Sequence, residues 1–197
     1  MSKRDLPGLV GARICHDLIS PIGAIGNGIE LLTLSGGPPS PELKLISESV
    51  AGASAKVRFL RIAFGRAEAQ AQIGPEEARR LLSDLAVGGK LTYDWQVTEA
   101  ASRPEVRCAF LALLCIKSAM PMGGQLTISA SGGVWHVYGR TETRRLQEDL
   151  WQHLSDEGNA DPILPSDVHF ALLPEAAVDI GRQVRWAERA DGIAITF

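Results

Sequence analysis

The sequence predicts an α+β protein in which an N-terminal antiparallel helical hairpin precedes a sandwich of helices and strands. Three observations lead to this prediction. Apolar residues recur at helical spacing over two long segments near the N-terminus. A short run of glycine and proline separates these two segments. The remaining chain alternates helical patterns with short strands that are joined by turn residues.

The first helix is predicted to begin within residues 6–9, with Pro7 in its first turn, and to end near residue 33. Its apolar residues recur at steps of three and four: Ile14, Leu18, Ile22, Ile25, Ile29 and Leu32. At about 100° per residue, they form a seam about 80° wide. Polar and small residues lie on the opposite side: His16, Ser20, Gly23 and Asn27. A histidine there is accessible to another molecule, and the small residues beside it leave room for that molecule.

The second helix is predicted to begin at Ser40 and Pro41, a capping serine followed by a proline in the first turn. Its apolar residues follow a heptad: Leu43, Ile46, Val50, Ala53, Val57, Leu60 and Phe64. Leu45, Phe59 and Ile62 lie off this seam and need another partner. Two explanations stay open. Two hairpins can pair into a dimeric four-helix bundle, which we favour, or the hairpin can pack against the rest of its own chain.

We place a domain boundary between a hairpin at residues 1–70 and an α/β domain at residues 75–197. Helices are predicted at 75–86, 104–117, 143–154 and 168–180. Strands are predicted at 90–97, 125–131, 134–140, 183–189 and 192–197. Helices interleaved with mainly hairpin-joined strands are typical of an α+β sandwich.

The composition of the chain argues against several classes of partner and binding site. The net charge of −3 gives no general attraction to nucleic acid or to an anionic membrane. No apolar run reaches transmembrane length, and no signal peptide precedes the first helix. The three cysteines form no C-x-x-C pair, and the four histidines lack ligand spacing. We therefore expect a cytoplasmic protein with no metal site and with neither nucleic acid nor a membrane as a partner.

His16 is followed at once by Asp17 and, one turn later, by Ser20 and Pro21. Asp17 can accept a hydrogen bond from one ring nitrogen and so fix the tautomer. Pro21 costs the helix a hydrogen bond, which is unusual in an otherwise regular amphipathic helix. A functional histidine is therefore our interpretation, against the alternative of an ordinary polar residue on a solvated face.

The segment from Cys15 to Pro21 resembles the H-box of two-component histidine kinases. With Ala24, Ile25 and the stretch that ends at Leu32, it is closer still to the alphaproteobacterial histidine phosphotransferase family called ChpT. The resemblance implies a homodimer that relays a phosphoryl group between receiver-domain aspartates through phosphohistidine on His16. The implied partners are a hybrid histidine kinase upstream and response regulators of the CtrA and CpdR type downstream.

Within this interpretation, His16 and Asp17 are the catalytic residues, with Asp17 orienting the ring and assisting proton movement. The face that bears His16 is expected to dock the receiver, and its other members are Arg13, Ser20, Gly23 and Asn27. A basic cluster in the second half is a further docking candidate, although an ordinary solvated face is the simpler explanation: Arg140, Arg144 and Arg145.

The second half resembles the ATP-binding domain of histidine kinases without its nucleotide motifs. Residues 121–124 match a Pro-x-Gly-Gly turn of that family. Counting back from this turn, Cys115 and Leu111 stand where the kinases carry asparagines. A thiol and a leucine cannot hold Mg²⁺, which prefers oxygen ligands. We therefore expect no ATP and no cofactor of its own, with Mg²⁺ supplied by the partner receiver.

Two alternatives have different consequences. A divergent sensor histidine kinase core would bind ATP and label His16 without a partner. A non-catalytic receiver-binding adaptor would tolerate His16→Ala both in binding and in function. A chance motif on a plain core helix is a weaker third alternative, in which His16→Ala changes stability by no more than about 0.5 kcal/mol and costs no activity.

Overall fold

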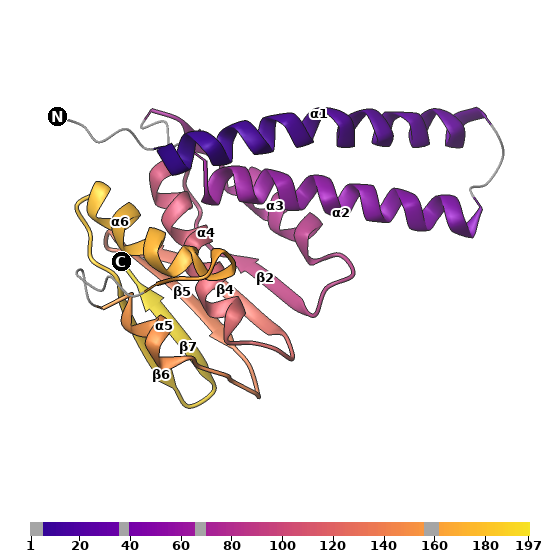
Figure 1. Ribbon diagram of the computed structural model, residues 1–197. Helices are drawn as coiled ribbons and strands as arrows, with labels where there is room; N and C mark the ends of the chain where they lie inside the picture. The colour runs from indigo at the N-terminus through magenta and orange to yellow at the C-terminus, as the bar shows by residue number, and fades with distance from the viewer. Residues whose placement is uncertain (1–5, 36–39, 66–69, 156–161) are drawn as a thin grey trace. The chain divides into compact units, whose positions relative to one another are not determined.

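The structure is a computed structural model that describes residues 6–35, 40–65, 70–155 and 162–197. The chain divides into two compact units, Met1–Arg66 and Ala67–Phe197. The first is a pair of long helices, and the second combines a five-stranded sheet with helices (Figure 1). The α+β class predicted from the sequence is confirmed.

The first unit consists of α1 (Leu6–Ser35) and α2 (Pro41–Ala63), which pack side by side. The predicted start of α2 is confirmed. Ser40 is the N-cap, its hydroxyl accepts a hydrogen bond from the Leu43 amide at 3.3 Å, and Pro41 follows in the first turn. Helix α1 continues through Pro21 as one element.

The apolar seam of α1 is divided between two faces. Cys15 and Ile29 are buried, and Gly26 lies so close to α2 that a Cβ there would be 3.7 Å from Val50. The other edge of the seam is 45–62% exposed in the single chain: Ile14, Leu18, Ile25 and Leu32. By helical angle, Cys15, Gly26 and Ile29 lie at about 60–120° from Ile14, at and just beyond one edge of the seam, and the exposed residues lie at about 0–40°. The hairpin therefore covers only one edge of the seam.

Helix α2 shows the same division. Of the three residues expected to need another partner, Phe59 and Ile62 are buried within the single chain, at 3% and 6% exposure. Leu45 is 65% exposed, and its neighbour Ile46 is 49% exposed. The uncovered apolar surface of α2 is therefore near its N-terminus.

The second unit is built on a mixed sheet in the order β2-β4-β5-β7-β6. Strands β2 and β4 are parallel, and the other neighbours are antiparallel. The strand bounds are β2 (Leu91–Trp95), β4 (Gly124–Ser131), β5 (Val134–Arg140), β6 (Arg185–Arg189) and β7 (Gly192–Thr196). Gly132 and Gly133 join β4 to β5 with φ of 58° and 79°, a conformation that two-residue hairpins require and glycine adopts without strain.

The helices of this unit are α3 (Pro75–Ala86), α4 (Arg103–Ser118), α5 (Glu148–Gln152) and α6 (His169–Asp179). A 3-10 turn spans Pro165–Asp167, and two short strands that the sequence did not predict pair with each other: β1 (Gln72–Ile73) and β3 (Ala101–Ser102). Helix α4 packs on β5 and β7, and α6 packs on α4.

The helix predicted at 143–154 is wrong over its first part, because α5 spans only Glu148–Gln152. The Thr141 hydroxyl donates to the carbonyls of Gly123 and Thr143, each at 3.0 Å. The Arg145 amide donates to the Ala119 carbonyl at 3.0 Å. Hydrogen bonds to the turn after α4 thus take the place of helical ones in this segment.

The core of the second unit lies between α4 and the sheet. Leu126, Ile128, Val137, Ile193 and Ile195 alternate along their strands and are fully buried. An aromatic group continues this core, with ring centroids 5.7 to 6.3 Å apart: Trp95, Phe110, Trp135 and Phe197. Trp135 is therefore a packing residue.

Glu105 connects three elements of this unit. At the start of α4 it accepts hydrogen bonds from the amide and the hydroxyl of Ser102, at 3.2 and 2.7 Å. It also accepts from Trp135 Nε1 at 3.4 Å and from Arg182 Nη2 at 2.7 Å. Burial alone would raise the pKa of Glu105, but the hydrogen bonds from Ser102 and Trp135 and the charge of Arg182 together hold it below its ordinary value.

Glu105→Ala should lower the free energy of unfolding of the second unit by about 3 kcal/mol, because it leaves a part-buried arginine and an indole N–H without their acceptor. Urea unfolding measures this change. Glu105 contributes stability above its unfolded pKa, and that contribution is lost as the pH falls through the lower folded pKa. A fall in pH should therefore lower the free energy of unfolding of the wild type more than that of the Glu105→Gln variant. Glu99→Gln, at an exposed position, is the control, and equal acid sensitivity of all three proteins contradicts the prediction.

Candidate functional site

His16 projects from α1 with its side chain 81% exposed. Its Nδ1 lies 3.3 Å from Oδ1 of Asp17. An ionised carboxylate can only accept a hydrogen bond, so this contact requires the proton on Nδ1. The lone pair is then on Nε2, the ring nitrogen that is available to a reacting group.

The other carboxylate oxygen of Asp17, Oδ2, also accepts a hydrogen bond. Arg13 Nε donates to Oδ2 at 2.9 Å, one helical turn before Asp17. The hydrogen bond from His16 and the neighbouring Arg13 guanidinium hold the pKa of Asp17 below its ordinary value. The carboxylate therefore remains ionised at neutral pH. From the sequence, Arg13 was expected only to dock the receiver, although the i,i+4 spacing of opposite charges could have indicated this ion pair.

The remaining predicted docking residues lie along the same exposed face of α1. Ser20, Gly23 and Asn27 are all exposed. A Cβ built on Gly23 meets no atom within 4 Å, so the surface at Gly23, about two turns after His16, is open. The structure thus brings together the six predicted site residues on one helix, and their roles in docking stay predictions.

Comparison with known proteins places the chain in a family. The family described as "Histidine phosphotransferase C-terminal domain" matches residues 75–192, from α3 into β7. The chain belongs to this histidine phosphotransferase family. The matched range covers most of the second unit and does not include His16, so the family match and the geometry of α1 are independent observations.

Two further comparisons agree with this assignment. The chain is 37% identical over 134 residues to "Protein phosphotransferase ChpT" of Brucella abortus (strain 2308). That alignment covers 67% of this chain and 64% of the length of the Brucella protein. A solved bacterial phosphotransferase is 27% identical with a TM-score of 0.68, covering 100% of this chain and 97% of the other.

The two residues that the sequence comparison expected at the positions of kinase asparagines lie inside the core. Leu111 and Cys115 are fully buried in α4. Burial raises the pKa of the Cys115 thiol well above its ordinary value, and its Sγ contacts the His169 carbonyl at 3.9 Å. Burial also lowers the pKa of His169 to about 4, so this imidazole is neutral at pH 7. A protonated thiol and an aliphatic side chain do not coordinate Mg²⁺, so Cys115 and Leu111 provide no ligand for this ion.

The segment after β5 packs an aromatic residue beside α6. Trp151 of α5 is 1% exposed, with its ring 5.5 Å from Phe170 and 4.9 Å from Trp186. Trp186 is therefore in a packing cluster with Trp151. Within the described parts of the chain, no group of three or more His, Cys, Asp or Glu side chains is placed to hold a metal ion. None of the described helices is long and apolar enough to cross a membrane.

Two arginines of the predicted basic cluster already have acidic partners. Arg140 Nε lies 3.0 Å from Oδ2 of Asp191, and Arg144 Nε lies 3.7 Å from Oε2 of Glu188. Arg144 also donates to the carbonyls of Arg189 and Ala190. These contacts favour a structural role for the cluster at the end of β5 over a docking role.

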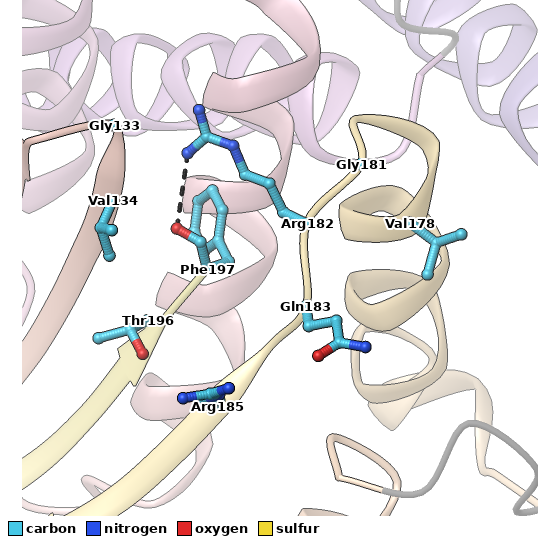
Figure 2. Close-up of a pocket in the computed structure, with 9 residues that line it drawn as sticks. All are labelled: Gly133, Val134, Val178, Gly181, Arg182, Gln183, Arg185, Thr196 and Phe197. Atoms are coloured by element: carbon cyan, nitrogen blue, oxygen red, sulfur yellow. Dashed lines mark hydrogen bonds between the residues drawn. The ribbon is translucent and has the colours of Figure 1, made fainter.

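A pocket of about 710 Å³ opens between the end of α6 and the edge of the sheet (Figure 2). Arg182 lies in its wall, and its Nη1 donates to the Phe197 carbonyl at 3.5 Å while its Nη2 pairs with Glu105. The charge of Arg182 is thus neutralised within the protein. The exposed side chains of Val134 and Val178 line the same pocket.

Proposed function

We propose that this protein is a phosphorelay intermediate, in which His16 accepts a phosphoryl group from an aspartyl phosphate of one receiver domain and passes it to an aspartate of another. The single observation that carries the proposal is the exposed His16 ring with Nδ1 held by Asp17 and Nε2 presented outward. Membership of the histidine phosphotransferase family supports it.

The proposed transfer needs no net movement of protons. The Nε2 lone pair attacks phosphorus, the bond from phosphorus to the aspartate oxygen breaks, and its electron pair restores the carboxylate of the first receiver. The ring gains positive charge, which Asp17 stabilises through Nδ1–H. A carboxylate oxygen of the second receiver then attacks phosphorus, and the electron pair of the P–N bond returns to Nε2. Charge on the phosphoryl oxygens is neutralised by Mg²⁺ in the receiver.

The phosphoryl group comes from another protein in this proposal, and not from ATP bound to this chain. The buried Leu111 and Cys115 support this, because neither side chain offers an oxygen ligand to Mg²⁺. By family resemblance, the donor is the receiver of a hybrid histidine kinase, and the acceptors are response regulators of the CtrA and CpdR type. The reaction takes place in the cytoplasm, where such receivers act.

A second copy of the hairpin completes the first unit in this proposal. The exposed edge of the α1 seam and the exposed Leu45 of α2 are apolar, and two hairpins can bury them as a four-helix bundle. His16 lies about 160° around α1 from Leu18, which is in that edge. Dimerisation therefore leaves His16 accessible on each protomer.

Labelling with radioactive phosphate tests the transfer proposal. With Mg²⁺ and γ-labelled ATP alone, the purified protein should stay unlabelled. With a receiver of a hybrid kinase that has been phosphorylated and freed of ATP, the protein should acquire label that is labile in acid and stable in base, as a phosphohistidine is. Label from ATP alone would identify a kinase, and receiver binding without label in either sample would identify an adaptor. Either result overturns the proposal.

A further inference from the structure

We infer that Arg13 is a positioning residue that acts on His16 through Asp17, and that receiver contact is not its main role. The inference deepens the proposed function and rests on it, because it assigns to Arg13 a part in preparing His16 for transfer. It replaces the docking role that the helical angle alone suggested for this residue.

The geometry is a chain of two hydrogen bonds through one carboxylate. Arg13 Nε donates to Oδ2 of Asp17 at 2.9 Å, and His16 Nδ1 lies 3.3 Å from Oδ1 of the same group. The side chain of Asp17 is 50% exposed, so without a second partner its carboxylate is free to rotate and to exchange its contact with His16 for water. Arg13 fixes the plane of the carboxylate, and with it the oxygen that faces the imidazole.

The positive charge of Arg13 also favours the tautomer of His16 that carries its proton on Nδ1. Together with the hydrogen bond from His16, it holds the pKa of Asp17 below its ordinary value. A less basic carboxylate accepts the Nδ1–H hydrogen bond without removing the proton. The proton therefore stays on Nδ1, and Nε2 keeps the lone pair that attacks phosphorus.

Helix stability does not account for the placement of this pair. The cation precedes the anion by four residues, which is the weaker of the two orientations, and an exposed ion pair on a helix contributes little to its stability. Helix α2 carries a pair of the same order and spacing, Lys44 and Glu48, at 4.0 Å. The Arg13–Asp17 pair differs because its carboxylate also contacts His16. Lys44 is thus a matched control for removing a cation from an exposed i,i+4 pair.

The test uses Arg13→Gln, Arg13→Lys, Asp17→Asn, the double variant Arg13→Gln/Asp17→Asn and the control Lys44→Gln. Two quantities are measured on the full chain: the rate of transfer from a phosphorylated receiver, and the imidazole ¹⁵N chemical shifts of His16, which report the tautomer. Arg13→Gln should lower the rate by about three- to fivefold, as expected for an exposed charged contact, and should reduce the Nδ1–H population. Arg13→Lys should retain most of both, and Lys44→Gln should change neither.

The double variant separates the two roles of Arg13. If Arg13 acts through Asp17, adding Arg13→Gln to Asp17→Asn should cause no further loss of rate. A full additional loss, with weaker receiver binding and an unchanged tautomer, would show that Arg13 contacts the receiver and would overturn the inference. So would wild-type rate and tautomer in Arg13→Gln. If the wild type itself transfers nothing, the proposed function fails, whereas the ¹⁵N shifts still decide whether Arg13 controls the His16 tautomer.

Discussion

His16→Gln should abolish phosphoryl transfer from a phosphorylated receiver. The change removes the Nε2 lone pair, and an amide nitrogen is not a nucleophile of comparable strength, so we expect at least about a thousandfold loss of rate. Because the His16 side chain is 81% exposed, stability should change by no more than about 0.5 kcal/mol. The measurement is acid-labile label on the protein after rapid mixing with a labelled receiver.

His136→Gln is a suitable control, since His136 is also an exposed histidine but lies on β5 in the second unit. It should retain wild-type transfer. Circular dichroism and receiver binding show whether His16→Gln remains folded and competent to dock. Undiminished label in a folded His16→Gln protein would mean that another side chain carries the phosphoryl group, and the site would have to be placed elsewhere.

Ile25→Glu should convert a dimeric wild type into a monomer. Ile25 is 53% exposed in the single chain and belongs to the uncovered edge of the α1 seam. In a twofold dimer the substitution places a carboxylate in the interface from each protomer. Desolvation of these charges should cost at least about 3 kcal/mol, which corresponds to a dissociation constant raised roughly a hundredfold. Sedimentation equilibrium measures this constant directly.

The position of the charge, and not its presence on the hairpin, should decide the result. Ser47→Glu adds the same charge at an exposed site on α2, about 160° around the helix from Leu45, and should leave the dimer intact. Ile25→Ala, which adds no charge, should weaken the dimer less than Ile25→Glu does. A monomeric wild type at micromolar concentration would contradict the proposed dimer, as would a dimer that Ile25→Glu does not weaken.

Much of the fold could be predicted from the sequence alone, because certain residue types specify the local conformation of the backbone. Ser40 and Pro41 specify where α2 begins, because a hydroxyl acceptor and a residue without an amide hydrogen suit the first turn of a helix. Gly132 and Gly133 specify the turn between β4 and β5, because their positive φ values are strained for other residues. The exposed face that bears His16 follows from helical periodicity, which assigns residues to faces without knowledge of the partner.

Other features depended on tertiary contacts, which the periodicity of the sequence does not predict. The sequence showed one apolar seam on α1, but two antiparallel helices touch along a narrow strip, so only one edge of that seam is buried within the hairpin. The segment before α5 has a helical pattern, yet hydrogen bonds from Thr141 and Arg145 to the turn after α4 hold it in a non-helical conformation. In both cases a tertiary contact overrides the local pattern.

The hydrogen-bond networks around Glu105 and Asp17 were likewise not predicted by the periodicity of the sequence. Glu105 and Arg182 are 77 residues apart in sequence and 2.7 Å apart in the structure, so no local pattern could have paired them. Arg13 and Asp17 are only four residues apart, but periodicity alone assigned them to different roles on one face. The sequence determined that His16 is exposed and followed by an acid. The three-dimensional structure decided which oxygen of that acid meets the imidazole, because the orientation of a carboxylate depends on all of its hydrogen-bond partners together.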